Sequence, residues 1–203
     1  TKIGRHNVTI DDGKCVFIIY VNVVPTLILT PTEGPVGTVV TAQGYGFPAS
    51  DGTKINVTIW WDYVDSCTPI TVALAWQLAT TQGQFTTTFT VPHTVGGTHI
   101  VSAIANDTLT TSADAEFKVL VTLKVTPSLP ANNGTLVTVS GTGLSNVTWY
   151  DLLINGKDYY TADGSGWTIF FHGDCVGDFS LQIIVDASFD PGTYAAVLYR
   201  LVD

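Results

Sequence analysis

The chain is built from short stretches in which apolar and polar residues alternate, separated by turn-forming residues. Val, Ile, Thr, Tyr, Phe and Trp dominate the stretches, and Gly, Pro, Asn and Asp interrupt them. In the stretch 85–90, Phe85, Thr87 and Phe89 share one face, and the alternating residues on the other face are all Thr. A side-chain period of two is typical of half-buried strands, whereas no stretch sustains the helical period of about 3.6 residues. The pattern predicts an all-β protein of short strands, as in β-sandwiches.

An internal repeat divides the chain in two. Residues 27–47 and 123–144 both carry Thr-Pro, then Gly-Thr, a Val/Thr strand, Gly-x-Gly and a large apolar residue. Later segments match as well, including a Gly-Thr turn that opens a late strand in both repeats. A repeated unit of this size indicates one fold used twice. We therefore expect two tandem immunoglobulin-like β-sandwiches, the first repeat at residues 25–121 and the second at residues 122–203.

The two repeats are predicted to end differently. The first runs on to a final strand at 116–121, which in an immunoglobulin-like order pairs beside the strand at 98–105. The second finishes on the segment 193–203, which matches the penultimate strand of the first. We expect the second repeat to lack its last strand and to expose an unpaired sheet edge. The residues predicted on this acceptor edge are Tyr194, Ala196, Leu198 and Arg200.

The N-terminal segment 1–24 belongs to neither repeat. It stands before the Thr-Pro motif of the first repeat, just as 116–125 stands before the Thr-Pro motif of the second. Its strand is apolar on nearly both faces, as expected for a strand inserted between two neighbours. We predict that it is a donor strand, which fills the acceptor edge of the next molecule by β-strand addition. Two alternatives remain: the segment folds back onto its own chain as an extra strand, or it fills a slot in another partner. The donor residues are Val16, Phe17, Ile18, Ile19, Tyr20, Val21, Val23 and Val24.

Several features favour an extracellular protein. The chain starts at Thr1 rather than Met, so we expect a mature protein whose signal peptide has been removed. Three cysteines allow three disulfide pairings, including a bridge between subunits through Cys15, and the sequence does not choose among them. The cysteines are Cys15, Cys67 and Cys175. Five Asn-x-Ser/Thr sites predict covalent N-glycans at Asn7, Asn56, Asn106, Asn133 and Asn146.

Charge and motifs exclude other classes. Only 8 Lys and Arg stand against 17 Asp and Glu, and so acidic a chain cannot neutralise a phosphate backbone. No apolar run approaches the roughly 20 residues of a membrane-spanning helix. No hydrolase elbow and no metal-ligand spacing occur, so we expect neither an enzyme nor a cofactor or metal site. We interpret the run Trp60–Tyr63 as core or interface rather than a sugar-binding platform, and expect His93 and His99 to face solvent.

The Thr-Pro to Gly-x-Gly pattern resembles the immunoglobulin-like modules of the IPT/TIG kind in bacteria and archaea. With the apolar tail, the glycosylation sites and the shortened second repeat, the organisation resembles the archaeal thread-filament pilins of Sulfolobales, whose architecture parallels bacterial type 1 pilins. The resemblance implies a secreted, N-glycosylated pilus subunit that joins copies of itself head to tail by donor-strand complementation. Such a filament would serve adhesion or biofilm contact and survive in acid. The alternative is a monomeric cell-envelope adhesive or carbohydrate-binding domain pair.

Overall fold

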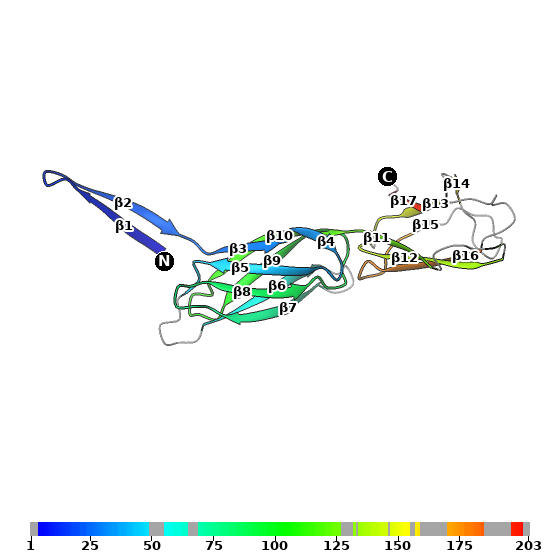
Figure 1. Ribbon diagram of the computed structural model, residues 1–203, viewed down its shortest axis with the longest axis horizontal. Helices are drawn as coiled ribbons and strands as arrows, with labels where there is room; N and C mark the ends of the chain where they lie inside the picture. The colour runs from blue at the N-terminus through cyan, green and yellow to red at the C-terminus, as the bar shows by residue number, and fades with distance from the viewer. Residues whose placement is uncertain are drawn as a thin grey trace.

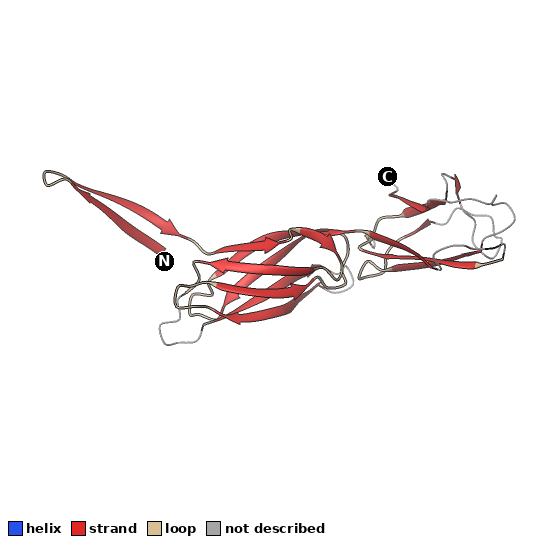
Figure 2. Ribbon diagram, viewed as in Figure 1, coloured by secondary structure: helices blue, strands red, loops and turns tan. Residues whose placement is uncertain are grey.

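The computed structural model describes residues 4–48, 55–64, 69–126, 132, 134–145, 147–154, 157–158, 170–184 and 196–200. Every regular element in this part of the chain is a strand (Figure 2). The prediction of an all-β protein is confirmed. A hairpin projects at one end of the long axis, and two strand-rich bodies, which correspond to the two repeats, follow one another along it (Figure 1).

The first repeat contains two sheets. Its strands are β3 (Thr26–Thr30), β4 (Glu33–Pro35), β5 (Val39–Tyr45), β6 (Asn56–Val64), β7 (Pro69–Leu78), β8 (Phe85–Thr90), β9 (Gly97–Ala105) and β10 (Ser112–Leu120). One sheet has the order β3-β5-β8 and the other the order β4-β10-β9-β6-β7. Neighbouring strands are antiparallel, except that β4 runs parallel to the end of β10.

The core of the first repeat lies between these sheets. Phe85 and Phe89 of β8 are buried while the threonines between and after them are half-buried or exposed, as the alternation predicts. Trp61 of β6 is fully buried, and its ring lies 6.1 Å from that of Phe89 and 5.8 Å from that of Phe117. Phe117 comes from β10, so the last strand of this repeat supplies one of the largest side chains of its core.

The second repeat follows almost without a linker, since only Val121 separates β10 from β11. Its described strands are β11 (Thr122–Thr126), β12 (Leu136–Thr142), β13 (Tyr150–Ile154), β14 (Lys157–Asp158), β15 (Phe170–Phe171), β16 (Phe179–Ile184) and β17 (Ala196–Arg200). The sheet β11-β12-β16 matches β3-β5-β8 in order, and β13 pairs with β14, β15 and β17. A second hydrophobic cluster forms from Val137, Val139, Leu144, Leu152, Phe179 and Ile183.

The sequence repeat is also a repeat of structure. In the first repeat Gly44 lies in register with Phe85 of the neighbouring strand, and in the second Gly141 lies in register with Phe179. A Cβ at either glycine would collide with that aromatic ring, so both positions require glycine. The backbone N–H of Phe47 donates to Gly83 O at 3.0 Å, and that of Leu144 donates to Gly177 O at 2.9 Å.

Candidate functional site

The N-terminal segment forms a hairpin of β1 (Gly4–Asp11) and β2 (Val16–Val23). The strands pair antiparallel from Gly4 opposite Val23 to Asp11 opposite Val16. In the turn, Asp12 Oδ1 accepts hydrogen bonds from the N–H groups of Cys15 at 2.7 Å and Lys14 at 2.9 Å. These bonds favour the ionised carboxylate and lower the pKa of Asp12, with the bond from Cys15 as the larger cause. The predicted donor strand is thus one arm of a hairpin.

The second arm, β1, was missed by the sequence interpretation, although a signal for it exists. The pair Asp12-Gly13 stands between the alternating stretch 5–11 and the apolar stretch 16–21. An Asp-Gly pair flanked by alternating apolar residues is a strong hairpin signal, because Gly readily takes the positive φ that such turns require. Gly13 has a φ of 78°.

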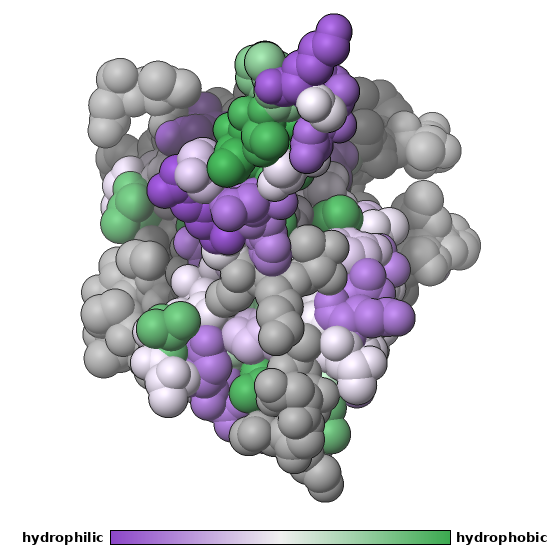
Figure 3. Space-filling model, turned by 90° about the vertical axis from the view of Figure 1, so that its left-hand side faces the viewer, coloured by the Kyte–Doolittle hydropathy of each residue, from purple (hydrophilic) through white to green (hydrophobic). Residues whose placement is uncertain are grey.

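The hairpin exposes an unusual amount of apolar surface. The six consecutive residues Val16–Val21 are each 46–61% exposed. Among the described residues, β1 and β2 pair only with each other and join neither repeat. In the view onto this end of the molecule, apolar residues gather at the top, where the hairpin projects (Figure 3). Contiguous exposed apolar surface of this kind marks an interaction site.

The two faces of the hairpin differ in character. Because directly opposed residues of paired strands share a face, the register separates two sets of side chains. The apolar face carries Val8, Ile10, Phe17, Ile19, Val21 and Val23, together with Gly4 and His6. The mixed face carries Arg5, Asn7, Thr9, Asp11, Val16, Ile18, Tyr20 and Asn22. On the mixed face the Arg5 guanidinium carbon lies 3.5 Å from the centre of the Tyr20 ring, a cation–π contact.

The predicted acceptor edge falls on β17, apart from Tyr194, which lies outside the described residues. Ala196 and Leu198 pack against the second core, and Arg200 is exposed. β17 pairs with β13, and no strand within the described ranges pairs with its other edge. In the first repeat the corresponding strand β9 lies between β6 and β10. The counterpart of β10 is therefore what the described second repeat lacks.

The predicted glycosylation sites lie in different settings. Asn7 of β1 and Asn106 after β9 are exposed, and Asn56 at the start of β6 is half-buried. Asn106 Oδ1 accepts a hydrogen bond from the N–H of Asn56 at 2.8 Å, and the side-chain nitrogen of Asn106, to which a glycan would attach, takes no part in this bond. Asn133 and Asn146 lie outside the described residues.

The cysteines also differ. Cys15 is a free, exposed thiol at the hairpin turn. Cys175, in the turn before β16, is disulfide-bonded, and Cys67 lies outside the described residues. A bridge between subunits through Cys15 stays a prediction.

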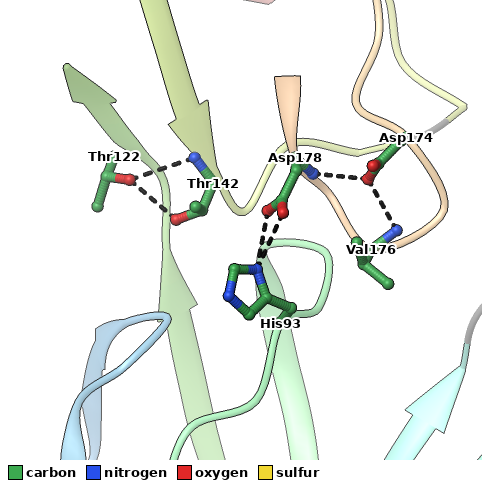
Figure 4. A network of polar contacts seen from close by, with 6 residues as sticks. All are labelled: His93, Thr122, Thr142, Asp174, Val176 and Asp178. Carbon is green, nitrogen blue, oxygen red and sulfur yellow. Dashed lines mark hydrogen bonds and ion pairs between the residues drawn. The ribbon is translucent and has the colours of Figure 1, made fainter. Parts of the chain in front are cut away.

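Polar contacts join the two repeats. His93, in the loop after β8, lies with Nδ1 2.9 Å from Asp178 Oδ2 of the second repeat (Figure 4). Asp178 in turn donates its backbone N–H to Asp174 Oδ1 at 2.8 Å. The backbones of the two repeats also approach closely here, so that a Cβ added at Gly177 would lie only 2.8 Å from Thr94 O. The two repeats therefore contact each other directly, with no spacer between them.

The two histidines predicted to face solvent behave differently. The side chain of His93 is 62% exposed, as expected. The prediction for His99 is wrong: its side chain is buried and stacks on Trp61 at a ring distance of 5.1 Å. Inward positions alternate along β9, and His99 falls on the same face as Val101. Its Nε2 lies 2.9 Å from Val95 O, which satisfies the buried imidazole.

The remaining candidates are the aromatic run at Trp61, a metal site, a membrane-spanning helix and a surface groove. The burial of Trp61 confirms its interpretation as core. No group of three side chains suited to hold a metal ion occurs within the described part of the chain. Nor do the described residues include a helix long and apolar enough to cross a bilayer. An open groove of about 640 Å³ runs along β11, β12 and β16 and includes Lys124, Ser140 and Asp178 in its lining.

Comparisons with known proteins assign no family. No family model matches the chain, and no curated protein matches its sequence. Among solved structures, Escherichia coli alpha-2-macroglobulin activated by porcine elastase is 15% identical, with a TM-score of 0.35 over 98% of this chain and 23% of that one. Red sea bream transglutaminase is 10% identical, with a TM-score of 0.32 over 79% of this chain and 26% of that one. The chain thus spans about a quarter of these proteins, and likenesses this low carry no functional argument.

Proposed function

We propose that the protein is a structural subunit of an extracellular filament, not an enzyme, and that it polymerises head to tail by donor-strand complementation. The observation that carries the proposal is a pair of unmatched surfaces. The apolar strand β2 projects into solvent, while β17 has an edge that no described strand covers. In this proposal the body of the subunit is two tandem immunoglobulin-like sandwiches, and the second is completed by a neighbouring subunit.

The energetics favour such an exchange. Burying one exposed apolar side chain of this size contributes about 1.5–3 kcal/mol. Insertion would also pair the backbone groups along the edge of β17 that no described strand pairs, and an unpaired edge is a template for non-specific association. Because β2 is already extended in the hairpin, less conformational entropy is lost on binding than for an unstructured tail. β2 is therefore already close to the extended conformation that insertion requires.

The positions of the two surfaces determine the kind of assembly. The hairpin projects from one end of the long axis, and β17 belongs to the body at the other end (Figure 1). A contact between two different surfaces is heterologous and yields an open filament unless the rotation between subunits closes a ring. The partner of the protein is then another copy of itself.

The remaining features agree with the outside of a cell. Exposed Asn7 and Asn106 are accessible to glycosylation, which would help to keep a weakly charged, apolar chain soluble. The resemblance to Sulfolobales thread pilins adds adhesion or biofilm contact as the role, and N-glycans as the only attached groups. We expect assembled filaments to persist from pH 7 to pH 3, and disassembly over that range would contradict the acid setting.

Deletion of residues 1–24 tests the proposal. We expect the full-length chain to form filaments in negative-stain microscopy and the deletion variant to be monodisperse by light scattering. Deletion of residues 1–3, which leaves the described hairpin intact, is the matched control and should still polymerise. A full-length chain that stays monomeric, or a deletion variant that still forms filaments, would refute the proposal.

The alternative, a monomeric adhesive or carbohydrate-binding domain pair, rests on the groove along β11, β12 and β16. Hydroxyl and carboxylate groups line it, but its aromatic side chain, Phe179, is buried rather than displayed for stacking on a sugar. A binding protein of this kind would retain its ligand, and remain monomeric, with or without residues 1–24.

A further inference from the structure

The structure relates β2 to β10 position by position. Each enters the following repeat past a glycine with positive φ, Gly46 at 71° and Gly143 at 81°. The Cβ position of Gly46 lies 3.0 Å from Val24 O, and that of Gly143 lies 3.0 Å from Leu120 O. Val24 therefore stands in the first repeat where Leu120 stands in the second.

Counting back along both strands from this shared contact defines which side chains correspond. Residue n of β2 corresponds to residue n + 96 of β10. The residues of β10 that face the first core are Ala113, Ala115, Phe117 and Val119. Their counterparts on β2 are Phe17, Ile19, Val21 and Val23. These four all belong to the apolar face of the hairpin.

The composition of β2 supports the same face. Its side with Phe17, Ile19, Val21 and Val23 is apolar throughout, whereas the other side includes the polar residue Asn22. In the hairpin Val8 and Ile10 lie beside Ile19 and Phe17, and the half-buried His6 lies beside Val21. The repeat and the composition of β2 thus select the same inward side.

The register on the acceptor follows from β9. In the first repeat Ala113 lies opposite Ala103, which in turn lies opposite Ile59 of β6. In the second repeat Leu198 of β17 lies opposite Leu152 of β13, and both belong to the second core. Because the repeats align Gly97 with Gly192, Leu198 is the counterpart of Ala103. Phe17 of a neighbouring subunit would then lie opposite Leu198, and Ile19 opposite Ala196.

We propose that β2 leaves β1 and inserts into the second repeat of a neighbouring copy, with Phe17, Ile19, Val21 and Val23 inward, β2 antiparallel to β17 and Phe17 opposite Leu198. This rests on the proposed filament function. In the first repeat Ala105 N–H donates to Thr111 O at 2.8 Å and Lys118 N–H donates to Thr32 O at 3.0 Å, so the core-facing residues of β10 direct their backbone groups to β9. In the hairpin Asp12 N–H donates to Cys15 O at 3.4 Å, so the corresponding residues of β2 direct theirs to β1. β1 therefore occupies the edge of β2 that β17 requires, and the two must exchange.

A matched pair of substitutions tests the face. Phe17 and Ile18 are 61% and 51% exposed, so Asp at either position should leave the chain's own fold unchanged. Phe17→Asp places a charge in the acceptor core and should abolish filaments. Ile18→Asp should retain them, because its counterpart on β10 is Asp114, an exposed residue on the outer face. Equal loss from both variants, or loss from Ile18→Asp alone, would overturn the proposed face.

Disulfide trapping tests the register. The proposed pairing places Ile18 opposite Val197 on the outer face, at the Cβ separation of directly opposed strand residues. In a Cys15→Ser background, Ile18→Cys with Val197→Cys should give a ladder of covalent oligomers on a non-reducing gel that collapses with thiol. The control pair Ile19→Cys with Val197→Cys places the sulfurs on opposite faces and should give no ladder. Filaments that yield the ladder only from the control pair would overturn the register.

A staple within the hairpin tests whether β1 must leave β2. Thr9 lies directly opposite Ile18, so Thr9→Cys with Ile18→Cys in the Cys15→Ser background would link β1 to β2. Stapled chains should form no filaments while the Cys15→Ser parent polymerises, and thiol should restore assembly of the stapled chains. Stapled chains that polymerise like the parent would mean that β1 stays with β2 and would overturn the exchange. If the parent forms no filaments, the filament function fails and this proposal fails with it.

Discussion

β10 and β2 hold the same position before a repeat, yet one is a core strand and the other lies in water. Phe117 of β10 is fully buried against Trp61, whereas its counterpart Val21 on β2 is 46% exposed. The sequences of the two strands differ accordingly. β10 alternates small or apolar residues with Asp114, Glu116 and Lys118, as suits a strand with one wet face, while β2 is apolar at nearly every position. The comparison shows that the burial of a strand depends on the sheet offered to it as well as on its own sequence.

The largest predicted difference between the two strands concerns their aromatic residues. Phe117→Ala should destabilise the first repeat by about 3–5 kcal/mol, because it empties a fully enclosed site. Phe17→Ala should leave the stability of the unassembled chain unchanged within about 0.5 kcal/mol, because its side chain is exposed. Urea unfolding followed by tryptophan fluorescence measures both. A large loss from Phe17→Ala in unassembled chains would mean that the hairpin packs on its own subunit.

The glycines that follow the two strands test whether β2 and β10 enter their repeats in the same way. Gly46→Ala and Gly143→Ala each force a side chain into a left-handed backbone, at a cost of about 1–2 kcal/mol. Both also crowd the carbonyl of the preceding strand. We expect equal losses in thermal or urea unfolding, with Thr86→Ala on the exposed face of β8 as a neutral control. A loss at only one glycine would break the equivalence.

A polar contact between His93 and Asp178 joins the second repeat to the first. His93→Ala removes the pair with Asp178 and should cost at most about 1 kcal/mol, since both side chains are partly exposed. High salt should reduce the difference between the variant and the parent chain. Differential scanning calorimetry at low and high salt provides the measurement. An effect that does not change with salt would indicate packing rather than charge.

The smallest predicted effect concerns the hairpin turn. The pKa of Asp12 is lowered from 3.8 in the folded chain, so its carboxylate stabilises the turn above about pH 4. This contribution is lost as the pH falls through the lowered pKa. Amide chemical shifts of Lys14 and Cys15 should titrate with it, and Asp12→Asn should remove that titration while keeping an oxygen acceptor. A titration that persists in the Asn variant would show that Asp12 is not its source.

Much of the architecture follows from local patterns. Alternation in 85–90 predicts the buried face of β8, and the repeated Gly-x-Gly motif marks equivalent turns, where Gly46 and Gly143 both have a positive φ. The interpretation of Trp61 as core is likewise confirmed. These succeed because the physical cause lies within a few residues of the signal.

Other features depend on which elements meet in space. His99 points inward because it falls on the face of β9 that packs against the core, where it stacks on Trp61 of β6. The polarity of histidine alone predicted an exposed side chain. The contact of His93 with Asp178 joins residues 85 positions apart, which no local pattern connects. The hairpin is a different case, since Asp12-Gly13 was a readable signal. The uniform apolarity of β2 drew attention to one strand and away from the alternation in β1.

The single residue Val121 between β10 and β11 has a consequence for any load carried by the protein. A pull along the chain passes from the last strand of one repeat to the first strand of the next, with no slack peptide to stretch first. Extension would therefore begin only when a β-sheet shears. A row of such subunits would behave as a stiff, nearly inextensible cord.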